Sequence, residues 1–315
     1  MRSTGVKKIG FLSFGHWSDS PHSETRTASD AVLQAVDLAV AAEELGADGA
    51  YFRVHHFARQ LTAPFPLLAA IGAKTERIEI GTGVIDMRYE NPMYMAEDAG
   101  AADLIAGGRL QLGISRGSPE QVIDGWRYFG YQPGEGETDA EMARTHAEVL
   151  LTVLEGKGFA QPNPRPMFPN PPGLLRVEPH SPGLRERIWW GAGSNATAVW
   201  AAEHGMNLMS STLKNDEGGA PFHVQQAEQI RRSARRGRKP GGSASRASRS
   251  RAASSRSPPT STAPTSVPTA RARTRSATST PTPRPSSAAP TPPNPTCWSS
   301  SWPGTRPSPR RTRCC

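Results

Sequence analysis

The sequence predicts an α/β fold built on a parallel sheet, contained in the first 232 of its 315 residues. Short apolar runs alternate six times with longer amphipathic runs in this part, which is the pattern of β/α units. After Arg232 the composition changes abruptly, because the last 83 residues contain no Asp, Glu, Leu, Ile, Met, Phe, Tyr or His. We therefore expect a folded domain at residues 1–232 and a basic, disordered tail rich in Ser, Pro, Thr and Arg at residues 233–315.

The first half of the domain gives four strands and three helices. The apolar run IGFLSF predicts a strand at residues 9–14. Residues 28–45 predict a helix, because apolar side chains recur at helical spacing and Gly46, a typical C-cap, follows them. The runs GAYFRV and IEIGTGVI predict strands at residues 49–54 and 78–85, with a helix beginning near residues 64–66 between them. A helix at 93–105 and the strand RLQLGIS at 109–115 complete this half.

The second half resumes the same rhythm after a loop-rich stretch. It predicts helices at 140–154, 196–204 and from 224 onward, strands at 187–193 and 206–211, and a Pro-rich excursion at 161–173. Six successive units favour either a (β/α)8 barrel or an open doubly wound sheet. The number of units is two short of a closed barrel.

Charge is divided unevenly between the two parts. The tail holds 16 of the 37 basic residues, and residues 1–232 hold the other 21 together with all 28 acidic ones, a net charge of −7. The overall charge of +9 is therefore no sign that the domain binds nucleic acid or a membrane. All three cysteines lie in the tail, which excludes a Cys-based metal site or a disulfide framework in the domain. Without a signal peptide or membrane-spanning run, a cytoplasmic location is expected.

Polar residues that follow the predicted strands are the candidates for ligand binding, since ligands lie at strand C-termini in both architectures. The candidates are His16, Trp17, His55, His56, Thr82, Arg116 and Ser194. Arg116 suits an anion, or else a surface ion pair. The segment GAGSNAT joins a strand to a helix, so the Ser194 and Thr197 hydroxyls with nearby backbone N–H groups suit a phosphate; helix capping explains them equally well.

His55 and His56 end the second strand, so one of them can act as a base or hydrogen-bond donor, with a purely structural role as the alternative. Neighbouring residues on a strand point to opposite faces, and no metal site is predicted from this pair. Trp126, with Tyr128 and Phe129, either lines a pocket for a flat ligand or covers the end of the barrel.

Four segments carry a family resemblance: VHHF at 54–57, IGTGVI at 80–85, NPMYMAEDAGAADLIAGGRLQLGISRG at 91–117 and SNATAVWAAEHG at 194–205. In this order they resemble the bacterial luciferase-like flavin-dependent monooxygenases. The resemblance implies a (β/α)8 TIM barrel, here incomplete at about six units. It implies reduced FMN, supplied by a separate reductase, and O2 acting on a small organic substrate. A complete barrel of this kind would be expected to form a homodimer.

The resemblance also assigns residues. Arg116, Ser194 and Thr197 would hold the FMN phosphate, and His55 matches the active-site histidine beside the flavin ring. Thr82 and Gly83 match the strand end where the backbone approaches that ring, and the Gly83–Val84 bond is a candidate for a non-prolyl cis peptide. His16, Trp17 and Trp126 would contribute to the substrate pocket.

One departure and one alternative limit the functional assignment. Val54 replaces the acidic residue that precedes the paired histidines in luciferase, so light emission from a long-chain aldehyde is not to be assumed. A related branch of the family uses the deazaflavin F420 and transfers hydride, and this alternative stays open.

Three interpretations of the tail compete: a disordered linker, a basic nucleic-acid-binding tail on a non-catalytic barrel, or translation in the wrong frame. Arginines with almost no aromatic residues among them argue against specific nucleic-acid recognition. GC-rich codons for residues 233–246, read one base upstream, give FREAWKEAGWERE, which continues the last helix. We therefore favour a frameshift near Ser233.

Overall fold

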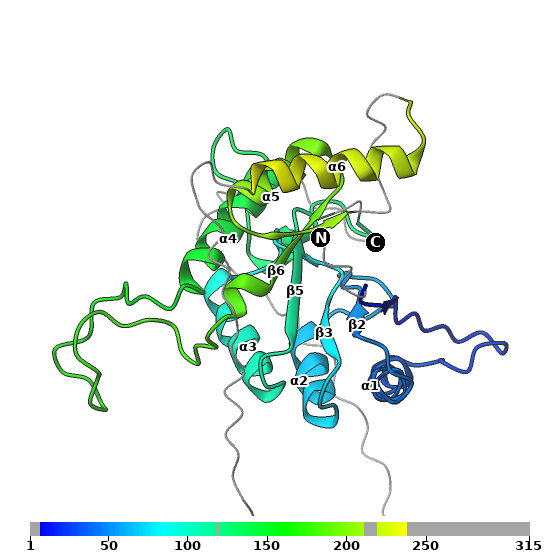
Figure 1. The fold of residues 1–315 in the computed structure, drawn as a ribbon. Coiled ribbons are helices and arrows are strands. Elements are labelled where there is room, and N and C mark those ends of the chain that lie inside the picture. The colour runs from blue at the N-terminus through cyan, green and yellow to red at the C-terminus, as the bar shows by residue number, and fades with distance from the viewer. Residues whose placement is uncertain (1–6, 118–119, 211–218, 238–315) are drawn as a thin grey trace, which may run out of the picture. The chain divides into compact units, whose positions relative to one another are not determined.

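The computed structural model describes residues 7–117, 120–210 and 219–237. Its elements are β1 (Gly10–Ser13), α1 (Ala28–Glu44), β2 (Gly49–Phe52), α2 (Pro64–Lys74), β3 (Glu79–Thr82), β4 (Ile85–Asp86), α3 (Pro92–Ile105), β5 (Leu110–Ser115), η1 (Gly125–Phe129), α4 (Asp139–Val153), η2 (Leu184–Arg187), β6 (Ile188–Ala192), α5 (Asn195–Glu203), β7 (Asn207–Ser210) and α6 (Phe222–Arg236) (Figure 1). Within these residues no helix is both long and apolar enough to cross a membrane.

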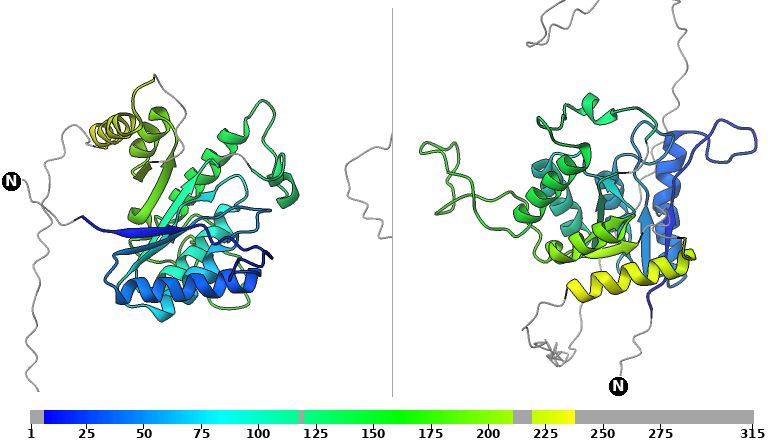
Figure 2. Two further views of the ribbon diagram at one scale, coloured as in Figure 1. Left: turned by 90° about the vertical axis from the view of Figure 1, so that its right-hand side faces the viewer. Right: turned by 90° about the horizontal axis from the view of Figure 1, so that it is seen from above.

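The strands form a parallel sheet in the order β1-β2-β3-β5-β6-β7, and β4 pairs with β5. The order follows the sequence without the reversal that defines a doubly wound sheet, so the architecture is that of a β/α barrel. Six β/α units are present in the described residues, and they form a half barrel with the helices outside the sheet (Figure 2). The predicted fold class and the incomplete barrel are confirmed.

The main core lies between the outer face of the sheet and the helices. Phe52, Leu112 and Trp190 are at most 1% exposed and belong to one apolar cluster with side chains of the surrounding helices. Trp190, for example, packs on Trp200 of α5 with ring centroids 4.7 Å apart. Burying each such side chain contributes about 1.5–3 kcal/mol. Because successive strand residues point to opposite faces, the residues between them face the inside of the half barrel.

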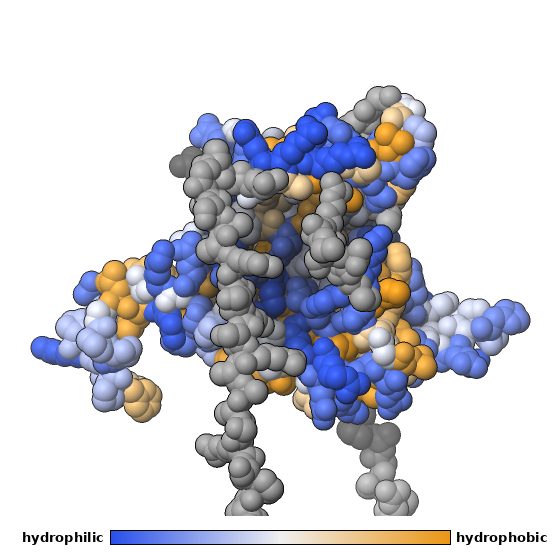
Figure 3. Space-filling model, in the orientation of Figure 1, coloured by the Kyte–Doolittle hydropathy of each residue, from blue (hydrophilic) through white to orange (hydrophobic). Residues whose placement is uncertain are grey.

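The predicted elements are all present, with boundaries shifted by a few residues, and two differences bear on function. The strand expected at 78–85 is divided into β3 and β4, and the Gly83–Val84 bond between them is cis, as the family resemblance suggested. Helix α6 runs on to Arg236, past the compositional change at Arg232. Its solvent-facing side is strongly hydrophilic (Figure 3). Residues of the expected tail beyond 237 lie outside the described part of the chain.

Candidate active site at the mouth of the half barrel

Glycines line the inner face of the sheet where β3, β5 and β6 end, at Gly83, Gly113 and Gly191. A Cβ on Gly113 would lie 2.2 Å from the Thr82 carbonyl oxygen, and one on Gly191 would lie 3.2 Å from Val84. Val84 itself packs over both glycines. The buried Thr82 hydroxyl donates to the Gly113 carbonyl (2.7 Å) and accepts from the Gly113 N–H (3.0 Å), which fixes these strands together. These three glycines form a floor without side chains of its own, and Val84 and Leu12 lie directly on it.

His55 follows β2 at the same edge of the sheet. Its Nε2 lies 2.7 Å from Nη2 of Arg53. A guanidinium group only donates hydrogen bonds, so Nε2 accepts and the neutral ring carries its proton on Nδ1. Burial, followed by the charge of Arg53, lowers the pKa of His55. The imidazole is therefore neutral at pH 7, and its Nδ1–H is the group with which it can donate a hydrogen bond.

His16 and Trp17 lie on the loop after β1. The His16 ring stacks on Phe14 with centroids 5.8 Å apart and forms a 3.1 Å hydrogen bond with Gln60. It is close enough to His55 to contribute to lowering the pKa of that residue. Trp17 lies under the Arg59 guanidinium and lines a separate cavity of about 290 Å3 between α1 and α2. The structure therefore places His16 near His55 and Trp17 at the cavity between α1 and α2.

Ser194 and Thr197 form a reciprocal capping box at the N-terminus of α5. The Ser194 hydroxyl accepts from the Thr197 N–H, and the Thr197 hydroxyl accepts from the Ser194 N–H, each at 3.3 Å. The fully buried Gln229 of α6 holds this turn by donating to the Ser194 carbonyl (3.0 Å). Arg116, directly after β5, is exposed. Arg116 and the N-terminus of α5 thus follow the neighbouring strands β5 and β6, and the two hydroxyls are engaged in the helix cap.

A buried charge cluster stands next to the mouth, and the sequence did not point to it. Arg88 is 8% exposed and pairs with Asp86 (2.7 Å), Asp139 (2.7 Å) and Glu120. The Tyr89 hydroxyl donates to Glu120 as well. Burial raises the pKa of Glu120 to about 7, and its hydrogen bond with Asp86 acts in the same direction. The acidic partners come from three separate segments, so no local pattern marks the cluster.

An aromatic cover lies over this cluster. Trp126 of η1 is buried against Tyr89, and its ring faces the Arg88 guanidinium at 4.9 Å. His56 stacks on Tyr89 with ring centroids 4.2 Å apart, and Phe129 packs edge-on against both. The structure thus places Trp126 beneath the loop that follows β5, where it anchors that loop to the end of the sheet.

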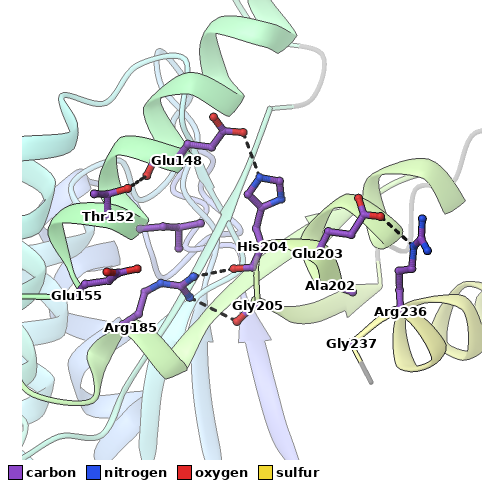
Figure 4. Close-up of a pocket in the computed structure, with 11 residues that line it drawn as sticks. Glu148, Thr152, Glu155, Arg185, Ala202, Glu203, His204, Gly205, Arg236 and Gly237 are labelled. Atoms are coloured by element: carbon purple, nitrogen blue, oxygen red, sulfur yellow. Dashed lines mark hydrogen bonds and ion pairs between the residues drawn. The ribbon is translucent and has the colours of Figure 1, made fainter. Parts of the chain in front are cut away.

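A larger cavity, of about 880 Å3, lies away from the mouth (Figure 4). Figure 4 shows Glu148 paired with His204 (3.2 Å), Arg185 donating to the carbonyls of His204 and Gly205, and Arg236 paired with Glu203. These residues come mainly from the C-terminal ends of α4, α5 and α6. Helices run antiparallel to strands in β/α units, so this cavity is at the opposite edge of the sheet from His55.

Comparison of the sequence with known proteins points to one family. Residues 8–260 match the luciferase-like monooxygenase family, so the match continues into the expected tail. The chain is 30% identical to the uncharacterized protein YwcH of Bacillus subtilis over 202 residues, covering 64% of this chain and 57% of that protein. It is 30% identical to the oxygenase component of a flavin-dependent trigonelline monooxygenase of Acinetobacter baylyi, covering 61% and 51%. An F420-dependent glucose-6-phosphate dehydrogenase of Nocardia farcinica is 38% identical over 122 residues, 37% of this chain and 35% of that one.

A solved structure shares the fold. The crystal structure of the monooxygenase RslO1 from Streptomyces bottropensis has a TM-score of 0.57 at 22% identity, covering 74% of this chain and 68% of that one. The chain spans little more than half the length of the curated relatives that it matches. With the family match extending over residues 8–260, the chain belongs to the luciferase-like monooxygenase family of oxidoreductases.

Proposed function

We propose that the chain is a flavin-dependent monooxygenase that uses reduced FMN and O2 to oxidise a small organic substrate. The observation that carries this proposal is the glycine floor at Gly83, Gly113 and Gly191 beside the neutral His55. The similarity to the oxygenase component of a flavin-dependent monooxygenase supports it. That similarity also supports a separate reductase as the source of reduced FMN.

Each residue of the mouth has a role in this proposal. Arg116 and the N-terminus of α5, shaped by Ser194 and Thr197, bind the phosphate. Thr82 holds the glycine floor on which the ring lies, and the bound cofactor supplies the oxygen-activating chemistry. His55 holds a proton on Nδ1 next to the reacting groups. The loop carrying Phe129 excludes water from the mouth.

The second candidate function is hydride transfer with F420. The relative at 38% identity is an F420-dependent dehydrogenase, although that match covers 37% of the chain. A deazaflavin ring is as flat as a flavin ring, and the same floor therefore receives either.

Anaerobic titration with reduced FMN and reduced F420, followed by protein fluorescence, separates the two functions. We expect saturable one-to-one binding of FMN, and binding about tenfold or more weaker in Arg116→Gln, because a charge-assisted contact to phosphate is lost. Arg127→Gln, another exposed arginine paired only with Asp124 among the described residues, is the matched control. Tighter binding of F420 than of FMN, with oxygen consumption by FMN and a flavin reductase unchanged when the chain is added, would exclude the monooxygenase proposal.

A further inference from the structure

Arg53 lies on the inner face of the half barrel, level with the glycine floor. Its neighbours Phe52 and Val54 are buried on the outer face, so Arg53 points inward. The parallel register pairs Phe52 with Thr82, and the Gly83 N–H donates to the Phe52 carbonyl (2.8 Å). One residue further along, Arg53 therefore stands beside Gly83.

The contacts of Arg53 leave its charge uncompensated. Its guanidinium lies 4.8 Å from the Phe14 ring centroid and donates to the neutral His55 at 2.7 Å. Its Nε is buried without a hydrogen-bond partner. In the described part of the chain no carboxylate lies within ion-pairing distance of it, whereas Arg88 has three such partners. Burial accordingly lowers the pKa of Arg53.

A partly buried cation without an ion-pair partner is suited to bind an anion. Buried charges in proteins are ordinarily paired, because taking an ion out of water is costly. The proposed phosphate site is at β5 and β6, two to three strand spacings from β2, or roughly 10–14 Å. The planar guanidinium offers two parallel N–H donors, which match the two oxygens of a carboxylate.

We propose that Arg53 is a specificity-determining residue that binds a carboxylate of the substrate, so that the enzyme acts on small organic acids. This inference rests on the proposed function, since it places the acid over the glycine floor and next to His55. The carboxylate replaces the missing counter-charge and shares the Arg53 guanidinium with the imidazole. Neutral amides of the same shape lack the negative charge and the second acceptor oxygen, and they bind less well.

Binding of benzoate and its neutral analogue benzamide to the full chain, measured by calorimetry without cofactor, tests the proposal. We expect benzoate to bind at least tenfold more tightly than benzamide, and this preference to disappear in Arg53→Gln. Arg53→Lys keeps the charge but not the two parallel N–H donors, and it should retain part of the preference for benzoate. Arg59→Gln, which removes an exposed arginine next to Trp17, is the matched control and should keep all of it. By NMR, benzoate should also raise the pKa of His55, because it neutralises the adjacent cation.

The outcomes separate this inference from the proposed function. Equal binding of benzoate and benzamide, or no saturable benzoate binding, overturns the inference, and neither result depends on any variant folding. A preference that survives in a folded Arg53→Gln overturns it too. If Arg53→Gln weakens FMN binding but leaves the benzoate preference intact, the anion belongs to the cofactor and the substrate assignment is wrong. The unmodified chain could also bind neither FMN nor F420 and still lose its benzoate preference in Arg53→Gln. That result supports the Arg53 site and refutes the proposed function.

Discussion

Replacing Arg88 by methionine tests whether the charge cluster fastens the loop after β5 to the barrel mouth. The side chains of Arg88, Asp86 and Glu120 are 9%, 12% and 12% exposed. Removing the guanidinium leaves two buried carboxylates facing each other. Breaking a buried ion pair in this way costs about 3–5 kcal/mol. Methionine keeps apolar packing against Trp126, so we expect the loss to be mainly electrostatic.

The loss of unfolding free energy in Arg88→Met should depend on pH. Burial raises the pKa of Glu120 to about 7, while Arg88 acts to lower it. A carboxyl with a raised pKa in the folded state contributes its stability fully below its unfolded pKa of about 4.5 and loses it as the pH rises through about 7. Without Arg88 the pKa rises further, and protonation relieves the repulsion in acid. We therefore expect a loss of about 3–5 kcal/mol at pH 8 and a clearly smaller one at pH 5.5.

Urea unfolding followed by tryptophan fluorescence at these two pH values measures both effects. Asp139→Asn is the control, because the Asp139 side chain is 37% exposed and its pairing with Arg88 should contribute about 1 kcal/mol or less. If Arg88→Met unfolds within about 1 kcal/mol of the unmodified chain at pH 8, the cluster does not hold the loop. An equal loss at both pH values would contradict the assigned role of Glu120.

Three further predictions concern other buried polar groups. Burial, with Asp86 and Asp98 nearby, raises the pKa of Glu90 to about 7. Glu90→Gln should accordingly stabilise the fold by up to about 3 kcal/mol at pH 8 and hardly at all below pH 4.5, as measured by denaturation midpoints across pH. The fully buried Asp103 accepts hydrogen bonds from the Leu110 N–H (2.9 Å), Ser181 and Arg187, so Asp103→Asn should cost about 3 kcal/mol; an unchanged Tm would contradict this. Gln229→Leu should cost about 1–3 kcal/mol and speed amide exchange at the start of α5, and unchanged exchange there would show that α6 does not hold that turn.

Local pattern was enough to predict most of the fold. The amphipathic spacing before Gly46 identified α1, and the glycine takes the φ of +85° that a helix end favours. His55, Thr82 and Gly83 could be placed together because the C-termini of parallel strands meet at one edge. The cis bond at Gly83–Val84 came from the family resemblance alone.

The residues that sequence reasoning missed depend on tertiary contacts. Arg88 forms ion pairs with Glu120 and Asp139, which lie 32 and 51 residues away in the sequence. A local sequence pattern cannot predict contacts over such separations. The orientation of Arg53 could have been predicted from the sequence. It lies between the apolar residues Phe52 and Val54 in a predicted strand, so its side chain faces the opposite side of the sheet. Trp126 was expected to line a pocket or cover the barrel end. Its packing on Arg88 and Tyr89 shows that it anchors the loop after β5, and this packing could not be predicted from the sequence.

The central claim is that the glycine floor receives the flat ring of the cofactor, and Gly191→Ala tests it most directly. The added Cβ would lie 3.2 Å from Val84 and 3.4 Å from Ser115, so the Val84 side chain that covers Gly191 must shift by a few tenths of an ångström toward the space proposed for the ring. Anaerobic titration with reduced FMN should show one-to-one binding to the unmodified chain and at least tenfold weaker binding to Gly191→Ala, with unchanged urea unfolding. Equal affinity of the two proteins, or no FMN binding to the unmodified chain, would contradict the claim.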